Sequence, residues 1–94
     1  MMDNKVLYTN HAVKQMFSRN ISVTEEADVL ENGNVVIDYL DDKPFPSKLL
    51  FSKVNSRLLH VVCSYDSEKS VIIIITVYEP SADLWENDYK TRKK

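Results

Sequence analysis

Apolar residues recur at helical spacing in the first third of the chain and predict two amphipathic helices, over residues 10–19 and 23–32. Asn10 stands where the N-terminal cap of the first helix is expected. The apolar stripe of this helix consists of Ala12, Val13, Met16 and Phe17. Its polar stripe, at four-residue intervals, consists of His11, Gln15 and Arg19. The first helix therefore has one face for a core and one face for solvent or for a site.

The second helix has clear signals at both ends. Ser22 and Glu25 have the spacing of a capping box, and Gly33 stands where a left-handed residue commonly ends a helix. The apolar side chains between them are Val23, Ala27, Val29 and Leu30. Acidic residues follow on the other face and in the first turn, where they suit the helix dipole. We interpret this helix as structural.

After Gly33 the hydrophobic period changes to that of strands. The β-rich stretches are "NVVIDYL", "KLLFSKV", "LLHVVCSY" and "SVIIIITVYE". Pro44 and Pro46 separate the first from the second, because proline cannot donate to a ladder, and turn clusters separate the others. The closing stretch "SADLWENDYKTRKK" has Trp85 and Tyr89 at helical spacing. The predicted fold is α+β, with two N-terminal helices packed on a four-stranded antiparallel sheet and a short C-terminal helix.

The length of 94 residues and the apolar fraction of 44% favour a single folded domain over residues 1–94. The first residues contain no apolar run of signal-peptide length, and "VIIIITVY" is too short to cross a bilayer, which favours a cytoplasmic protein. Cys63 is the single cysteine, so an internal disulfide is excluded, and its apolar strand favours a buried, inert thiol.

Charge is distributed unevenly, although the net charge is only −2. No acid occurs between Asp42 and Asp66, and the chain closes on "YKTRKK". A fold that separates these segments from the acidic ones would present a basic face to an anionic partner. The alternative is an ordinary solvated strand surface. The candidate nucleic-acid-binding residues are Lys48, Lys53, Arg57 and Arg92.

A conditional register brings polar residues to one face of the sheet. If the two turns each have three residues, at 55–57 and 67–69, then His60 opposes Ser52 and Thr76, and Leu58 opposes Tyr78. The polar face would then carry His60, Thr76 and Tyr78. The apolar face would carry Leu49, Phe51, Leu59, Val61, Cys63, Ile73, Ile75 and Val77.

These residue types suit phosphodiester cleavage without a metal. The reaction needs a base for the ribose 2′-hydroxyl, an acid for the leaving oxygen and a cation for the developing charge, which imidazole and guanidinium groups supply. We predict that His11 or Arg19 reaches His60 at the open end of the sheet, with Arg92 at the rim. A strand histidine is often only a hydrogen-bonded structural residue, and this interpretation stays open. A metal shared by His11, His60 and Glu79 has no support in the spacing, so neither a metal nor a cofactor is expected.

The order and spacing of several motifs resemble the bacterial domain-of-unknown-function family 4258 across nearly the whole chain. The motifs are "YTNHAVKQMFSRNIS", "VIDY", "PFPS", "LLHVV", "ITVYEP" and "WxxDYKxR". Family members look related to small toxin ribonucleases of the barnase, EndoU, colicin and RelE type, and are often encoded beside a zinc-finger antitoxin with a helix-turn-helix part. By this resemblance, the recurrent polar positions are His11, Arg19, His60, Thr76, Tyr78, Glu79 and Arg92. Gln15 departs from the basic residue expected in the first helix.

The functional prediction is a metal-independent endoribonuclease, the toxin of a bacterial toxin–antitoxin pair. Its predicted catalytic residues are His11, Arg19, His60, Thr76 and Tyr78. Its expected partners are RNA and the antitoxin, with no membrane. The alternative is a non-catalytic protein-binding module or a decayed toxin-like regulatory domain, which the negative net charge, Gln15 and the aromatic stretch "DLWENDYK" favour.

Overall fold

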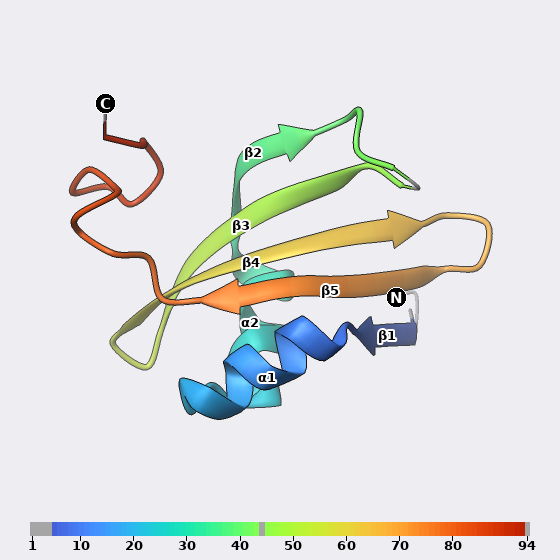
Figure 1. The fold of residues 1–94 in the computed structure, drawn as a ribbon, viewed down its shortest axis with the longest axis horizontal. Coiled ribbons are helices and arrows are strands. Elements are labelled where there is room, and N and C mark those ends of the chain that lie inside the picture. The colour runs from blue at the N-terminus through green and yellow to red at the C-terminus, as the bar shows by residue number, and fades with distance from the viewer. Residues whose placement is uncertain (1–4, 44, 94) are drawn as a thin grey trace.

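Two helices and five strands make up the part of the chain that the computed structural model describes, residues 5–43 and 45–93 (Figure 1). Pro44, one of the two expected strand breakers, lies outside the described residues. The elements in chain order are β1 (Lys5–Tyr8), α1 (Asn10–Ser18), α2 (Val23–Asn32), β2 (Asn34–Tyr39), β3 (Ser47–Val54), β4 (Arg57–Asp66) and β5 (Val71–Tyr78). No helix among them is long and apolar enough to cross a membrane.

The strands form one mixed sheet in the order β1-β5-β4-β3-β2. β1 runs parallel to β5, and the other neighbours are antiparallel. The predicted four-stranded antiparallel sheet is therefore wrong, although the class is α+β. The sequence did not predict β1, because four residues are too few to show a clear strand pattern. β1 is a strand because it pairs with the edge of β5, with Lys5 opposite Val71 and Tyr8 opposite Ile74.

The predicted C-terminal helix is also wrong. Residues 80–93 form turns and one isolated bridge between Trp85 and Arg92. The Asp88 carboxylate accepts hydrogen bonds from the backbone N–H groups of Lys90 and Thr91, which favours a tight turn over a helix. Tyr89, which follows Asp88 in this turn, has a φ of 56°, in the left-handed region. Trp85 is nevertheless buried, as its apolar ring requires.

Both N-terminal helices have the predicted ranges to within a residue. The cap of α1 is Thr9 and not Asn10, since the Thr9 hydroxyl accepts from the N–H of Ala12. The capping box of Ser22 and Glu25 is confirmed. Gly33 is extended, with a φ of −73°, so the left-handed stop expected there is wrong.

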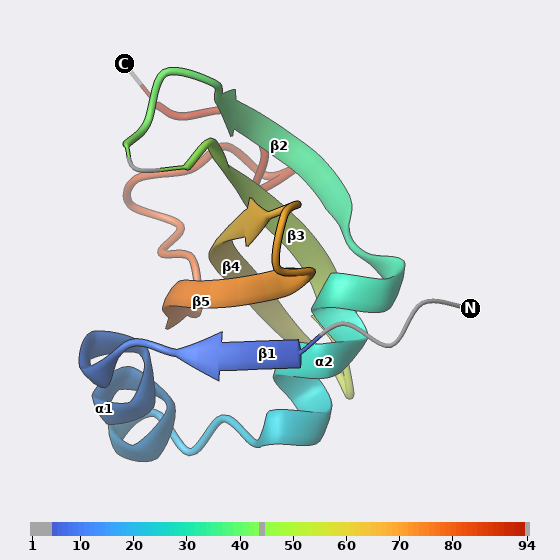
Figure 2. The ribbon, with the colours of Figure 1, turned by 90° about the vertical axis from the view of Figure 1, so that its right-hand side faces the viewer.

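The helices pack on one face of the sheet, while the segment after β5 turns toward the other side (Figures 1 and 2). The core between helices and sheet consists of Ala12, Met16, Ile21, Val29, Leu50, Val54, Leu59, Val61, Cys63, Ile74 and Val77. Ile74 and Val77 share this core although three positions separate them, because the β4–β5 register shifts between Val62 and Cys63. Of the predicted apolar face, Ile73 and Ile75 are absent from this core, and Leu50 takes the place given to Leu49 and Phe51.

The hairpin connections differ from the predicted three-residue turns. Between β3 and β4 the loop is Asn55 and Ser56, both with positive φ (51° and 67°), the geometry of a two-residue hairpin turn. Between β4 and β5 the loop spans residues 67–70. A change of loop length by one residue changes every pairing in the hairpin. His60 therefore lies opposite Phe51 and not Ser52 on β3. On β5 the longer loop and the register shift between Val62 and Cys63 together place it opposite Tyr78 and not Thr76.

A buried carboxyl group lies where α2 meets β1. Glu26 is fully buried, its Oε1 accepts from the Tyr8 hydroxyl at 2.6 Å, and its Oε2 has no hydrogen-bond partner among the described residues. Burial raises the pKa of Glu26, against the smaller opposing effect of the Tyr8 hydrogen bond. The folded chain therefore holds this proton more tightly than the unfolded chain does.

We expect this carboxyl group to make the fold less stable as pH rises. Between the ordinary glutamate pKa and the raised pKa of the folded state, only the folded chain keeps the proton, so the free energy of unfolding falls with pH. Glu26→Gln, which cannot ionise, should remove this slope of about 1.4 kcal/mol per pH unit within that interval. Urea unfolding from pH 5 to pH 9 measures it, with Glu31→Gln on the exposed face of α2 as control. Parallel pH curves for wild type and Glu26→Gln would contradict the interpretation.

Candidate functional site

His60 lies in the middle of β4, with its imidazole on the face of the sheet opposite the helices. Its neighbours along the strand, Leu59 and Val61, point into the helix-side core, so the alternation of a strand turns His60 the other way. The residue is fully buried. Both ring nitrogens have partners, since Nδ1 lies 3.0 Å from the Tyr78 hydroxyl and Nε2 lies 2.8 Å from the Tyr89 carbonyl oxygen.

These two partners assign the protons of the ring. A carbonyl oxygen only accepts, so Nε2 carries the proton and donates to Tyr89. In the neutral ring Nδ1 then accepts from the Tyr78 hydroxyl. Burial lowers the pKa of His60, which the hydrogen bond to Tyr89 partly opposes, and raises that of Tyr78. The pair is therefore a neutral imidazole and a neutral phenol at pH 7.

Aromatic rings surround the imidazole. The ring centroids of Trp85, Tyr78 and Phe51 lie 4.6, 5.2 and 5.6 Å from that of His60, all in edge-on arrangements. The ring of Tyr89 stacks on that of Phe51. The aromatic cluster thus consists of Phe51, His60, Tyr78, Trp85 and Tyr89. The first three of these come from the sheet, and the last two come from segment 80–93, which covers them.

A cation lies beside this cluster. The guanidinium carbon of Arg92 lies 5.4 Å from the centre of the Trp85 ring, in cation–π geometry. Its positive charge is close enough to the Tyr78 hydroxyl to lower the pKa of that group, against the larger effect of burial. Arg92 itself is exposed. The site therefore joins a buried proton acceptor to a positive charge at the surface.

The structure does not bring His11 or Arg19 to His60, so the predicted composite site is wrong. His11 is exposed on α1, which packs against β5, and Arg19 is exposed at the C-terminal cap of that helix. Both nitrogens of His60 are occupied by other partners. Gln15, the middle residue of the polar stripe on α1, has a structural role. Its side-chain oxygen accepts from the N–H of Val77 at 3.0 Å, where β1 no longer covers the edge of β5.

Arg57, predicted to bind nucleic acid, forms hydrogen bonds and ion pairs within the protein itself. Its guanidinium donates to the carbonyl oxygens of Arg19 and Asn20 at the end of α1, at 2.9 and 2.8 Å. It also pairs with Glu25 at 3.1 Å and Glu79 at 3.2 Å, and the hydrogen bond to Glu79 is the main cause of its raised pKa. Its donors are committed to the protein itself, so the predicted role in nucleic-acid binding is not supported.

The other predicted residues divide between the two faces. By the two-residue period of β3, the exposed Lys53 shares the face of Phe51, whereas Lys48 shares the face of Leu50. Thr76 pairs with Val62, one step along the sheet from the pair of His60 and Tyr78. The prediction that His60, Thr76 and Tyr78 share a face therefore agrees with the structure, although the predicted pairing does not.

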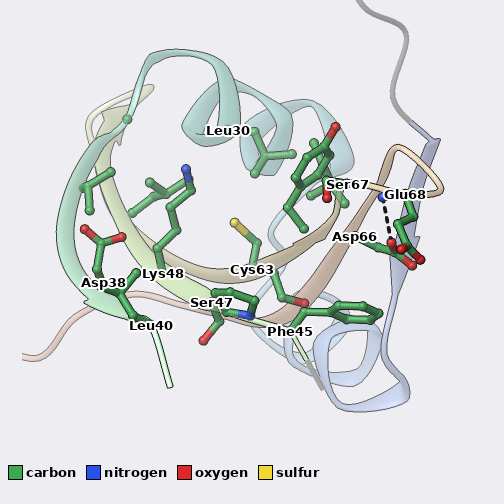
Figure 3. Close-up of a pocket in the computed structure, with 17 residues that line it drawn as sticks. Leu30, Asp38, Leu40, Phe45, Ser47, Lys48, Cys63, Asp66, Ser67 and Glu68 are labelled. Atoms are coloured by element: carbon green, nitrogen blue, oxygen red, sulfur yellow. Dashed lines mark hydrogen bonds between the residues drawn. The ribbon is translucent and has the colours of Figure 1, made fainter. Parts of the chain in front are cut away.

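A hollow that the sequence did not indicate lies on the helix side beyond the end of α2. It is a groove of about 810 Å³, largely apolar, whose lining includes Leu30, Lys48, Leu50 and Cys63 (Figure 3). Burial raises the pKa of the Cys63 thiol, which keeps the sulfur protonated and inert. The groove contains none of the predicted catalytic residues.

Within residues 5–43 and 45–93, no three His, Cys, Asp or Glu side chains gather in a way that could hold a metal ion. Comparison with protein families matches residues 8–79 to the family described as Domain of unknown function (DUF4258). No curated protein and no solved structure matches the chain.

Proposed function

We propose that this chain, which belongs to the DUF4258 family, is a metal-independent endoribonuclease whose reacting group is His60. The observation that carries this proposal is the hydrogen bond of 3.0 Å between Nδ1 of His60 and the Tyr78 hydroxyl. A hydroxyl on one ring nitrogen fixes the orientation of the imidazole and can either donate or accept. The other nitrogen, Nε2, points away from the sheet toward segment 80–93.

The proposed reaction uses the other tautomer of His60, formed when the Tyr89 carbonyl leaves Nε2 and the ring proton lies on Nδ1, which donates it to the Tyr78 hydroxyl. Nε2 then takes the proton of a ribose 2′-hydroxyl. The 2′-oxygen attacks phosphorus, the bond from phosphorus to the 5′-oxygen breaks, and that oxygen takes a proton from water. The imidazolium returns its proton to the remaining hydroxide. The products are a 2′,3′-cyclic phosphate and a 5′-hydroxyl.

The surroundings of His60 support a substrate with phosphates and unpaired bases. Arg92 supplies a fixed positive charge beside the cluster, which would stabilise the charge of the phosphorane. Lys53 adds a second exposed cation on the same face. Aromatic rings on a sheet face are a common surface for single-stranded RNA. The lowered pKa of His60 also favours the neutral imidazole that a base requires.

We expect the purified chain to cleave single-stranded RNA in the presence of a chelator. Tyr78→Phe should slow cleavage about tenfold, because it removes one hydrogen bond worth about 1.4 kcal/mol to the oriented imidazole. Denaturing gels and detection of cyclic-phosphate ends measure both rates. If wild type cleaves no faster than a buffer blank, or if Tyr78→Phe cleaves as fast as wild type, the proposal fails.

The second candidate is a protein-binding module without catalysis. It is favoured by the complete burial of His60 with both nitrogens bonded, and by the exposed Val13 and Phe17 on α1, the latter 90% exposed. Expression in a bacterial host separates the two. Growth arrest that Tyr78→Phe relieves favours a toxin held by an antitoxin, whereas unchanged growth favours the module.

A further inference from the structure

Tyr89 fills two positions in front of His60 at once. Its ring lies over that of Phe51 with 6.4 Å between the centroids and 19° between the planes, an offset stack. Its carbonyl oxygen accepts the Nε2 proton of His60 at 2.8 Å. A single residue of segment 80–93 therefore supplies both an aromatic ring on Phe51 and an oxygen on the imidazole.

Segment 80–93 holds Tyr89 in a backbone conformation that non-glycine residues seldom adopt. Its φ of 56° lies in the left-handed region, where a bulky residue is strained. Local hydrogen bonds offset this strain. The N–H of Tyr89 donates to the Glu86 carbonyl at 2.8 Å, and the Asp88 carboxylate accepts from the N–H groups of Lys90 and Thr91. The turn thus presents both the ring and the carbonyl oxygen to the sheet.

We propose that the face of Phe51 beside His60 is a base-stacking subsite for single-stranded RNA, and that Tyr89 occupies it in place of the base. This inference rests on the proposed function, because it assumes that the reacting phosphodiester lies at His60. In a nucleotide the base and the 2′-hydroxyl are carried by adjacent carbons of one sugar. Phe51 and His60 are paired neighbours across β3 and β4, so a base on Phe51 would place its own 2′-hydroxyl near the imidazole. Every base has a planar face, so stacking here requires no particular sequence.

Cations near the subsite fit the phosphates that flank a stacked base. Lys53 follows Phe51 by two positions on β3 and shares its face, and Arg92 lies over Trp85. Backbone phosphates beyond the stacked nucleotide would contact these groups, whereas a free nucleotide offers only one phosphate. The subsite is therefore expected to take a strand in preference to a mononucleotide.

The test measures binding of an RNA that cannot be cleaved. A fluorescein-labelled oligouridine with 2′-O-methyl riboses is titrated with full-length protein, and anisotropy gives the Kd. Tyr89→Ala should bind about tenfold more tightly than wild type, since one base then stacks on the uncovered Phe51. The double variant Phe51→Leu with Tyr89→Ala should lose this gain. Tyr65→Ala, at an exposed tyrosine near the other end of β4, is the matched control and should bind as wild type does.

Circular dichroism checks that each variant is folded, and Tyr89→Leu replaces Tyr89→Ala if the latter melts below the assay temperature. The inference is overturned if the Tyr89 variant binds no more tightly than wild type, or if the gain survives Phe51→Leu. Uridine monophosphate binding as tightly as the oligomer would overturn the preference for a strand. Because the probe lacks 2′-hydroxyls, a gain in binding stands even if the chain cleaves no RNA. Conversely, RNA cleavage with equal binding by wild type and Tyr89→Ala would leave the proposed function intact and remove this inference.

Discussion

Replacing His60 by asparagine should lower the rate of RNA cleavage by about two to four orders of magnitude, the usual contribution of a general base. The imidazole holds the acceptor nitrogen of the proposed reaction, and no other titratable side chain hydrogen-bonds to it except Tyr78 among the described residues. Asparagine retains a polar group near the position of Nδ1 but offers nothing at Nε2. Initial rates on a single-stranded RNA, measured in chelator, test this expectation.

His11→Gln is the matched control, because His11 is the other histidine of the chain and lies exposed on α1. Its cleavage rate should stay within about twofold of wild type, a change below about 0.4 kcal/mol in the barrier. Thermal unfolding of both variants separates lost chemistry from lost fold, since His60→Asn also breaks a buried hydrogen bond. Full activity of His60→Asn, or an inactive His11→Gln, would refute the assignment of His60.

Gly33→Ala should destabilise the fold by about 2–3 kcal/mol, at the upper end of the usual cost of overpacking. A Cβ atom at this position would lie 2.4 Å from the carbonyl oxygen of Val29 and 3.1 Å from that of Phe51. Both contacts are with backbone, which cannot move aside as a flexible side chain can. The same Val29 carbonyl accepts the Gly33 N–H at 2.8 Å, so relieving the clash would also disturb the end of α2.

Urea unfolding measures this loss, with Asn34→Ala as the control at the neighbouring exposed position. The control should change the free energy of unfolding by no more than about 0.5 kcal/mol, as surface substitutions usually do. Equal stability of Gly33→Ala and wild type would mean that the backbone at the C-terminal end of α2 shifts without cost to make room for the added Cβ atom. It would also leave the presence of the chain's one glycine at this point without a steric reason.

Local signals in the sequence determined the helices. The capping box of Ser22 and Glu25 and the helical spacing of Ala12 and Met16 depend on residues no more than four apart, so they can be recognised without a partner. The alternation around His60 likewise predicted that its side chain points away from those of Leu59 and Val61.

Only the tertiary structure decided the register and the edge of the sheet. The loop of Asn55 and Ser56 is one residue shorter than predicted, which moved the β3 partner of His60 from Ser52 to Phe51. The loop of residues 67–70 is one residue longer than predicted and the register shifts between Val62 and Cys63, so the β5 partner moved from Thr76 to Tyr78. β1 became a strand because β5 offers it free backbone groups, which no pattern within four residues can indicate.

The sequence and the tertiary structure each determined part of the candidate site. The sequence marked His60 and Tyr78 as polar residues of one sheet face, because a two-residue period is a local property. It could not indicate that α1 turns Gln15 to the edge of β5, or that Tyr89 returns to cover His60. The first contact joins residues separated by 62 positions in the chain, and the second joins residues separated by 29. Their geometry depends on the packing of the whole chain, which no short sequence pattern can indicate.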